Sequence, residues 1–291
     1  MKIDRLPVAP DLLGESPVWD PASGSLFWVD IAGRRVRRLH LASGEQRTWS
    51  TPSMVGSIGL ASHDRLVMGL QDGFYLLHLT TGAIEPIALL DAPNARMRLN
   101  DGRTDRTGRF ICGGMGLHGE PLGALHRLTA PGKLETLAEC IRISNTICFS
   151  PSGDRMYFAD SLARKIMVHD YARDGTTVGA PRLFFDTESL GSAPDGATVD
   201  SEGHLWVALV EAGRIARISA KGELMTVLDG PVEFPTCPAF GGEAMDVLFL
   251  TSIRDSGSGH MISSHPGAGV LVAISGLGVR GLPDAPFNLA S

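Results

Sequence analysis

Short apolar runs separated by polar turns recur along the whole chain. Six runs rich in Val, Leu, Ile, Phe and Trp occupy residues 27–29, 66–68, 109–111, 156–158, 205–207 and 247–249. Almost every run follows a polar turn that contains Gly or Asp, and a second alternating run comes after it. Apolar β-branched and aromatic residues bounded by such turns are typical of β-strands. The pattern therefore predicts an all-β protein built from short strands.

The spacing of the turns indicates how these strands are grouped. The turns return about every 40 to 50 residues, the interval expected for one four-stranded blade of a β-propeller. Six such turns predict six blades, and long helical periodicity is nearly absent. We therefore expect a six-bladed β-propeller with four antiparallel strands per blade, formed by residues 1–291 as a single domain. Closure of the ring requires residues near 3–8 to pair with the last blade.

Four of the predicted blades place an oxygen-bearing side chain at nearly the same distance before a turn glycine. The interval is eight residues in three blades and nine in the first, for the pairs Glu15 and Gly24, Asn100 and Gly108, Asn145 and Gly153, and Asp195 and Gly203. If the blades surround one axis, side chains of equal phase converge on it. The second and sixth blades offer small neutral groups at this phase, Ser57 and the neighbouring Thr236 and Cys237.

Two carboxylates and two amides that converge at one mouth of a channel favour a site for a hard divalent cation. A divalent ion offsets two negative charges, which Glu15 and Asp195 supply, whereas unpaired carboxylates in a narrow channel would repel each other. Oxygen ligands favour Ca²⁺, Mg²⁺ or Mn²⁺, and such sites also accept Zn²⁺ or Fe²⁺. The alternative is that the four side chains only cap turns and strand ends, which Asn and Asp often do.

Arg98 lies two residues before Asn100, so an extended chain presents both side chains on one face. A guanidinium beside a cation can hold substrate hydroxyls or a developing oxyanion. The competing interpretation is a salt bridge from Arg98 to Asp101 or Asp105.

With these residues in view, the chain resembles the senescence-marker-protein/gluconolactonase/regucalcin-like family. The resemblance rests on several short segments spread from the first predicted blade to the last. They are residues 13–19 (LGESPVW), 98–102 (RLNDG), 143–145 (ISN), 149–153 (FSPSG), 194–196 (PDG), 200–208 (DSEGHLWVA) and 240–242 (FGG). Together the segments are specific, although any one of them would be weak.

The resemblance implies a six-bladed propeller with one divalent ion at the channel mouth and hydrolysis of sugar lactones to aldonic acids. It implies that Glu15, Asn145 and Asp195 are the metal ligands, that Arg98 and Asn100 contact the sugar, and that Asp195 is also the base acting on water. The family commonly has Gly after the metal-binding Asn, where this chain has Thr146. A loop acid contacts substrate in the animal members, and Glu120 is the nearest candidate here.

Lactone hydrolysis also agrees with the residue types. A cation makes the carbonyl more electrophilic and a nearby carboxylate takes the proton of water, so no covalent nucleophile is required. The sequence has no G-x-S-x-G motif and no convincing Cys/His pair. Two alternatives stay open: a metal-dependent esterase or phosphotriesterase on the same site, and a non-catalytic propeller that binds calcium or a protein partner.

The bulk properties exclude several classes of partner. The net charge of −6 argues against a nucleic-acid surface. The one basic cluster, residues 34–38, is expected at a solvated blade edge. No stretch reaches the roughly 18 apolar residues of a membrane helix, and the N-terminus has no apolar signal region. The four cysteines lack metal-type spacing, which is typical of buried free thiols in a reducing compartment. We expect a cytoplasmic protein with a small-molecule substrate and no obligate protein partner.

Two glycine-rich segments can each be interpreted in two ways. Residues 114–119 match the dinucleotide pattern G-x-G-x-x-G, but the residues after them do not open a helix, so we expect a glycine-rich loop. His118 in that loop is expected at the surface, with an orientation toward the channel as the alternative. Residues 255–268 are rich in Gly and Ser and predict a flexible loop, with a lid over the channel as the alternative.

Overall fold

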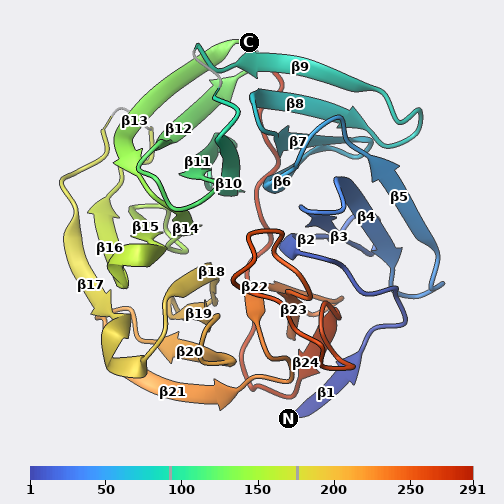
Figure 1. The fold of residues 1–291 in the computed structure, drawn as a ribbon, viewed down its shortest axis with the longest axis vertical. Coiled ribbons are helices and arrows are strands. Elements are labelled where there is room, and N and C mark those ends of the chain that lie inside the picture. The colour runs from blue at the N-terminus through green and yellow to red at the C-terminus, as the bar shows by residue number, and fades with distance from the viewer. Residues whose placement is uncertain (92–93, 175–176, 291) are drawn as a thin grey trace.

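The computed structural model describes residues 1–91, 94–174 and 177–290. Six four-stranded antiparallel sheets surround one central axis, and the innermost strands β2, β6, β10, β14, β18 and β22 lie closest to it (Figure 1). The expected six-bladed propeller is confirmed. In the described part of the chain the only helices are the short 3₁₀ turns η1 (Ser161–Ala163) and η2 (Thr187–Leu190).

Five blades are formed by four strands that follow one another along the chain. Blades one and two contain β2 (Gly14–Asp20), β3 (Ser25–Asp30), β4 (Arg35–His40) and β5 (Gln46–Ser50), then β6 (Ser57–Ser62), β7 (Arg65–Gly69), β8 (Gly73–His78) and β9 (Ile84–Leu89). Blades three and four contain β10 (Met97–Thr104), β11 (Phe110–Gly116), β12 (Gly123–Ala130) and β13 (Lys133–Ile141), then β14 (Ser144–Phe149), β15 (Arg155–Asp160), β16 (Lys165–Asp170) and β17 (Arg182–Asp186). Blade five contains β18 (Pro194–Val199), β19 (Leu205–Leu209), β20 (Arg214–Ile218) and β21 (Leu224–Asp229).

The two ends of the chain close the ring in blade six. Its strands β22 (Pro235–Gly241), β23 (Val247–Ser252) and β24 (Val272–Ser275) are joined by the N-terminal strand β1 (Lys2–Arg5). Strand β1 pairs antiparallel with β24, from Lys2 opposite Ser275 to Arg5 opposite Val272. The predicted closure is therefore confirmed, and it covers an edge of β24 that would otherwise expose unpaired backbone groups.

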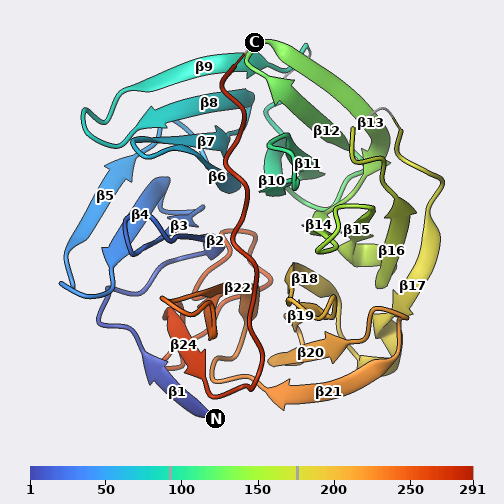
Figure 2. The same cartoon turned by 180° about the vertical axis from the view of Figure 1, so that it is seen from behind.

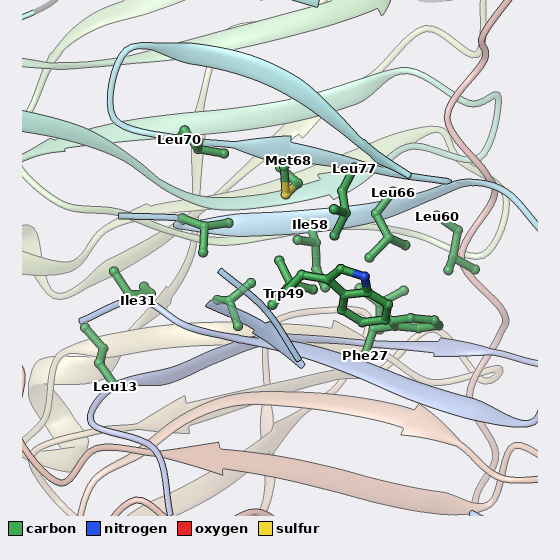
Figure 3. Close-up of a cluster of buried hydrophobic side chains, with 14 of the residues drawn as sticks. Leu13, Phe27, Ile31, Trp49, Ile58, Leu60, Leu66, Met68, Leu70 and Leu77 are labelled. Carbon is green, nitrogen blue, oxygen red and sulfur yellow. The ribbon is translucent and has the colours of Figure 1, made fainter. Parts of the chain in front are cut away.

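Apolar side chains from adjacent blades pack against each other and hold the ring together. Between blades one and two, Phe27 and Trp49 meet Ile58, Leu66 and Leu77, and all five are buried (Figure 3). The alternation of apolar residues along each strand supplies this layer, since successive side chains point to opposite faces of a sheet. The rigid stack fixes where the inner strands begin.

The basic cluster at residues 34–38 was expected at a solvated blade edge, and that prediction is wrong. Strand β4 is an inner member of its sheet, between β3 and β5. The side chain of Arg37 is 7% exposed and its Nη1 lies 2.5 Å from Asp11 Oδ1. The guanidinium also stacks over the ring of Trp28, with its carbon 4.9 Å from the centroid.

The cysteines are free, as expected, but only three are buried. Cys112, Cys148 and Cys237 are enclosed, whereas Cys140 is exposed. Burial raises the pKa of the Cys112 thiol to about 12, so this thiol is a packing residue and not a nucleophile. None of the helices in the described ranges is long and apolar enough to cross a bilayer.

After blade six the C-terminal segment turns back over the propeller. It runs across the middle of the face where the inner strands end, which we call the rear face (Figure 2). Its backbone is tied to four blades: Gly281 N donates to Met245 O, Ser201 N to Arg280 O, Phe287 N to Leu60 O and Asn288 N to Gly108 O. The opposite face, where the inner strands begin, is called the site face below.

Candidate active site

The four residues of equal phase all lie near the start of an inner strand, on the site face. Glu15, Asn145 and Asp195 are each the second residue of their strands β2, β14 and β18, and Asn100 is the fourth residue of β10. In each of these strands the register with the neighbouring strand shifts at or directly beside that position. Such β-bulges re-aim side chains and are over-represented next to active sites.

Asn100 joins two of the blades through its side-chain amide. Its Nδ2 donates to Asn145 Oδ1 at 3.1 Å and to Ser144 O at 2.8 Å. Asn145 Nδ2 in turn donates to Ser161 Oγ at 2.8 Å, and Ser161 Oγ donates to Pro194 O at 2.7 Å. This network fixes which end of each amide is oxygen, and it connects blades three, four and five immediately around Asp195.

Two of the bulges contain a non-glycine residue in the left-handed region. Ser16, after Glu15, has φ 47° and Thr146, after Asn145, has φ 62°. The left-handed region is a genuine outlier for a β-branched residue. Thr146 Oγ1 donates to Asp195 O at 2.7 Å, which ties the bulge of β14 to that of β18. The backbone conformation gives a physical reason for the glycine that the family commonly has at this position.

The two carboxylates of the group are close enough to affect each other. Burial, and after it the charges of Asp195 and Asp101, raises the pKa of Glu15 well above its ordinary value. Burial and the charge of Asp101 raise the pKa of Asp195 to about 8, and Arg98 opposes this shift. Neither Glu15 nor Asp195 forms a salt bridge within the described residues. Without a direct counter-charge, both side chains therefore favour the neutral acid in the metal-free protein at neutral pH.

Arg98 points toward the amides. Its Nη1 donates to Leu99 O at 3.1 Å and to Asn100 Oδ1. The competing salt bridge to Asp101 or Asp105 is absent among the described residues, since Asp101 accepts from Ile147 N and Asp105 pairs with Arg109. Burial lowers the pKa of Arg98 to about 10. At neutral pH the guanidinium of Arg98 is thus a buried cation close to Glu15 and Asp195.

Arg98 differs from the residues at equivalent positions in the other blades. Two residues before the side chain that faces the channel mouth, blade three has Arg98 and each of the other five blades has an apolar residue. The six residues at this phase are Leu13, Val55, Arg98, Ile143, Ala193 and Phe234. Four of them, Leu13, Val55, Ala193 and Phe234, belong to one continuous apolar cluster that spans blades five, six, one and two. At this phase Arg98 is therefore the only charged residue, and the equivalent positions of blades five, six, one and two form an apolar arc.

The residues present fit a divalent cation. Two unpaired carboxylates supply the charge that such an ion offsets, and Asn145 Oδ1 is an additional oxygen donor held in place by Asn100. In the described ranges no three His, Cys, Asp or Glu side chains form a metal cluster. The candidate set has only two acids with one amide, so it is a mixed oxygen site.

The comparisons with known proteins cover nearly the whole chain. Residues 13–254 match the family described as SMP-30/Gluconolactonase/LRE-like region. The chain belongs to this family. Regucalcin of Gallus gallus is 33% identical over 282 residues, which cover 94% of each chain. L-arabinolactonase of Azospirillum brasilense is 35% identical over 262 residues, covering 88% of this chain and 86% of the relative.

A solved structure of the family has the same propeller. It is regucalcin from Agrobacterium tumefaciens, described as a calcium-binding protein, and it is 32% identical to this chain. The two superpose with a TM-score of 0.91, covering 98% of this chain and 97% of that one. Family membership and fold thus agree with the resemblance that the sequence segments carry.

Glu120, suggested by the resemblance as a substrate contact, lies on the site face but apart from the donors. It belongs to the loop between β11 and β12, where its Oε2 accepts from His118 N at 2.9 Å and its Oε1 lies 3.7 Å from Arg96 Nη1. Among the described residues no hydrogen bond or ion pair joins Glu120 to Glu15, Asn145 or Asp195. His118 is exposed, as expected, and residues 114–119 open no helix. The predicted glycine-rich loop is shorter than expected, because β11 extends to Gly116.

The loop at 255–268 is tethered more firmly than its composition predicts. It follows β23 on the site face, where Ser263 Oγ donates to Glu233 Oε2. Met261 packs against the apolar cluster that includes Leu13 and Phe234, while His260 and His265 are exposed. The sequence predicted a plain flexible loop and did not indicate the contacts of Ser263 and Met261 that hold it to the propeller.

Sequence reasoning missed Asp101 as part of the site. Its Oδ2 accepts from Ile147 N at 2.7 Å, which joins β10 to β14 within the bulge that follows Asn145. Burial raises the pKa of Asp101 to about 6. The available signal was its place within the RLNDG segment, next to Asn100.

Proposed function

We propose that this protein is a metal-dependent sugar lactonase, which opens an aldonolactone to the aldonic acid. The observation that carries the proposal is the pair Glu15 and Asp195, each the second residue of an inner strand and without an ion-pair partner among the described residues, close enough for the charge of Asp195 to raise the pKa of Glu15. Membership in the gluconolactonase-like family and similarity to an L-arabinolactonase support the reaction class. Glu15, Asn145 and Asp195 would hold one divalent cation.

A bound divalent cation would polarise the lactone carbonyl and stabilise the negative charge that develops on its oxygen. Asp195 is suited to accept the proton of the attacking water, since it is only partly buried whereas Glu15 is buried. Arg98 holds Asn100 and can donate the rest of its guanidinium to a lactone hydroxyl or to the oxyanion. The apolar arc limits water around the reacting groups.

The proposed cation is one of Ca²⁺, Zn²⁺, Mn²⁺, Mg²⁺ or Fe²⁺. The Agrobacterium tumefaciens relative is described as a calcium-binding protein, which favours the first of these. Donors that are all oxygen favour hard ions in general, and three protein ligands leave positions for water and substrate. Glu120 remains a proposed substrate contact only if its loop closes toward the donors when substrate binds.

Turnover of a lactone panel tests this proposal. Pentono- and hexono-lactones would be assayed by acid release with the protein as purified, after removal of metal with a chelator, and after addition of each divalent ion. We expect at least one aldonolactone to be hydrolysed above background, with loss on chelation and recovery with a particular ion. Hydrolysis of aryl esters or phosphotriesters in preference to lactones would favour the esterase alternative. Tight calcium binding without turnover of any substrate would favour the non-catalytic one.

A further inference from the structure

The C-terminal segment carries one acidic side chain into the rear of the channel. Asp284 meets Arg103, whose Nη1 lies 3.2 Å from each carboxylate oxygen. The side chains of Arg103 and Asp284 are only 11% and 13% exposed. Both residues line two small cavities between the inner strands, together with Thr104, whose buried Oγ1 has no hydrogen-bond partner among the described residues. This ion pair therefore lies in the polar interior of the ring.

Arg103 joins the strands that carry two of the site residues. It belongs to β10, where regular pairing with β11 resumes after the bulge at Asn100. Its Nη2 donates to Ala197 O at 3.3 Å, and Ala197 is the residue at which β18 resumes pairing with β19 after the bulge at Asp195. The guanidinium of Arg103 thus links β10 to the end of the β18 bulge that faces away from the site face.

The C-terminal segment is held where Asp284 can orient this guanidinium. Arg106 Nη1 donates to Pro283 O at 3.2 Å, and Phe287 is buried among the side chains between blades two and three. A buried ion pair adds little to stability on its own, because desolvation offsets the attraction between the charges. Its geometry is well suited to a different role, that of holding a neighbouring strand in one arrangement.

We propose that Arg103 and Asp284 are a positioning pair, which fixes the bulge of β18 and thereby the orientation of Asp195 at the opposite mouth. The C-terminal segment is then a structural part of the site, although no hydrogen bond or ion pair among the described residues joins it to Glu15, Asn145 or Asp195. This inference rests on the proposed function for its metal and turnover measurements, whereas the effect on the β18 backbone is independent of it.

The variant Asp284→Asn tests the pair, because the amide keeps the shape and removes the charge. The matched control is Glu135→Gln in the same blade as Arg103. It also takes the carboxylate from a buried arginine, Arg127, but on an outer strand. Three quantities are measured: amide hydrogen exchange of residues 195–198 in the metal-free protein, affinity for a divalent cation by calorimetry, and kcat and KM for a lactone substrate.

We expect faster exchange in residues 195–198 and metal affinity about 10-fold lower for Asp284→Asn, the range typical when a group that orients a ligand is removed. The value of kcat should fall while KM stays unchanged, since Arg98 and Asn100 are not disturbed. Glu135→Gln should match the wild type in all three measurements. Unchanged exchange in residues 195–198 for Asp284→Asn would overturn the proposal.

The double variant Arg103→Met/Asp284→Leu separates positioning from stability. Replacing a buried ion pair by apolar side chains is often neutral or stabilising, so this variant should remain folded. It also removes the hydrogen bond to Ala197 O, so we expect its metal affinity to stay low and its exchange in β18 to stay fast. Wild-type exchange and metal affinity in the double variant would show that the pair has no positioning role.

The outcomes distinguish this inference from the proposed function. A wild-type protein that binds no divalent cation and opens no lactone would contradict the proposed function. The exchange rates of residues 195–198 would still decide whether Arg103 and Asp284 hold the bulge.

Discussion

At the scale of single residues, the site is an arrangement of charges that the protein alone leaves unbalanced. Glu15 and Asp195 raise the cost of each other's ionised form, and Arg98 supplies only one positive charge. A folded protein retains such a group where a ligand completes it, because unpaired buried charge is destabilising. The sequence could predict that the four side chains lie near the starts of inner strands, since their common phase is visible in the turns. For Asp101 it gave only the position next to Asn100, because the hydrogen bond from Ile147 depends on contact with another blade.

The proposed roles of Glu15 and Asp195 as metal ligands can be tested by replacing each with the neutral amide of the same shape. In Glu15→Gln and Asp195→Asn, metal affinity should fall steeply because one of the two charges that offset the cation is removed. The metal-free variants should be at least as stable as the wild type, since a buried unpaired carboxylate has been removed. For the wild type, metal at about 100 times its Kd should add about 2.7 kcal/mol to the free energy of unfolding.

Thermal unfolding with and without the metal measures both effects, and the exposed Glu45→Gln is the matched control. The same metal-induced rise in Tm in Glu15→Gln, Asp195→Asn and the control would contradict the assignment of the ligands.

At the scale of elements, the inner strands are specialised by their bulges. The apolar pattern predicts the strands and even the closure of blade six, because period-two alternation and turn residues are local signals. The bulges have no such signal, since a left-handed Thr146 looks like any strand residue in the sequence. Arg37 was misjudged for a related reason, since its partner Asp11 comes from a distant segment.

The bulge of β14 predicts an order of stability among variants of Thr146. Thr146→Ala loses the hydrogen bond from Oγ1 to Asp195 O and keeps a side chain in the left-handed region. Thr146→Gly loses the same bond but relieves the steric conflict, which is about 1–2 kcal/mol for a non-glycine residue. We expect Thr146→Gly to be the more stable of the two, by about 1 kcal/mol once the greater backbone entropy of glycine is counted.

Denaturant unfolding of both metal-free variants measures this difference. If Thr146→Ala were the more stable variant, the left-handed conformation at this position would be in doubt.

At the scale of the whole molecule, the ring acts as a frame that gathers distant residues at one mouth. The stability of the metal-free protein should depend on pH, because the ring buries Asp195 close to another carboxylate. Asp195 has a pKa of about 8 in the fold and an ordinary value of 3.8. Between these values the folded state binds more protons than the unfolded chain, so stability falls as pH rises, by up to about 1.4 kcal/mol per pH unit.

Unfolding in chelator between about pH 5 and pH 8 should therefore show a steeper loss of stability for the wild type than for Asp195→Asn. Added metal should reduce the loss, since the cation takes the place of the proton on the carboxylates. Parallel curves for the two proteins in chelator would mean that Asp195 is ionised normally without metal.

The central claim is that Glu15, Asn145 and Asp195 bind one cation. Anomalous X-ray diffraction from crystals grown with Mn²⁺ tests it most directly, because the signal locates the ion independently of the protein atoms. We predict a single strong peak at the channel mouth, at about 2.0–2.6 Å from an oxygen of each of the three side chains. No peak at the mouth, or a peak that touches none of these residues, would contradict the account.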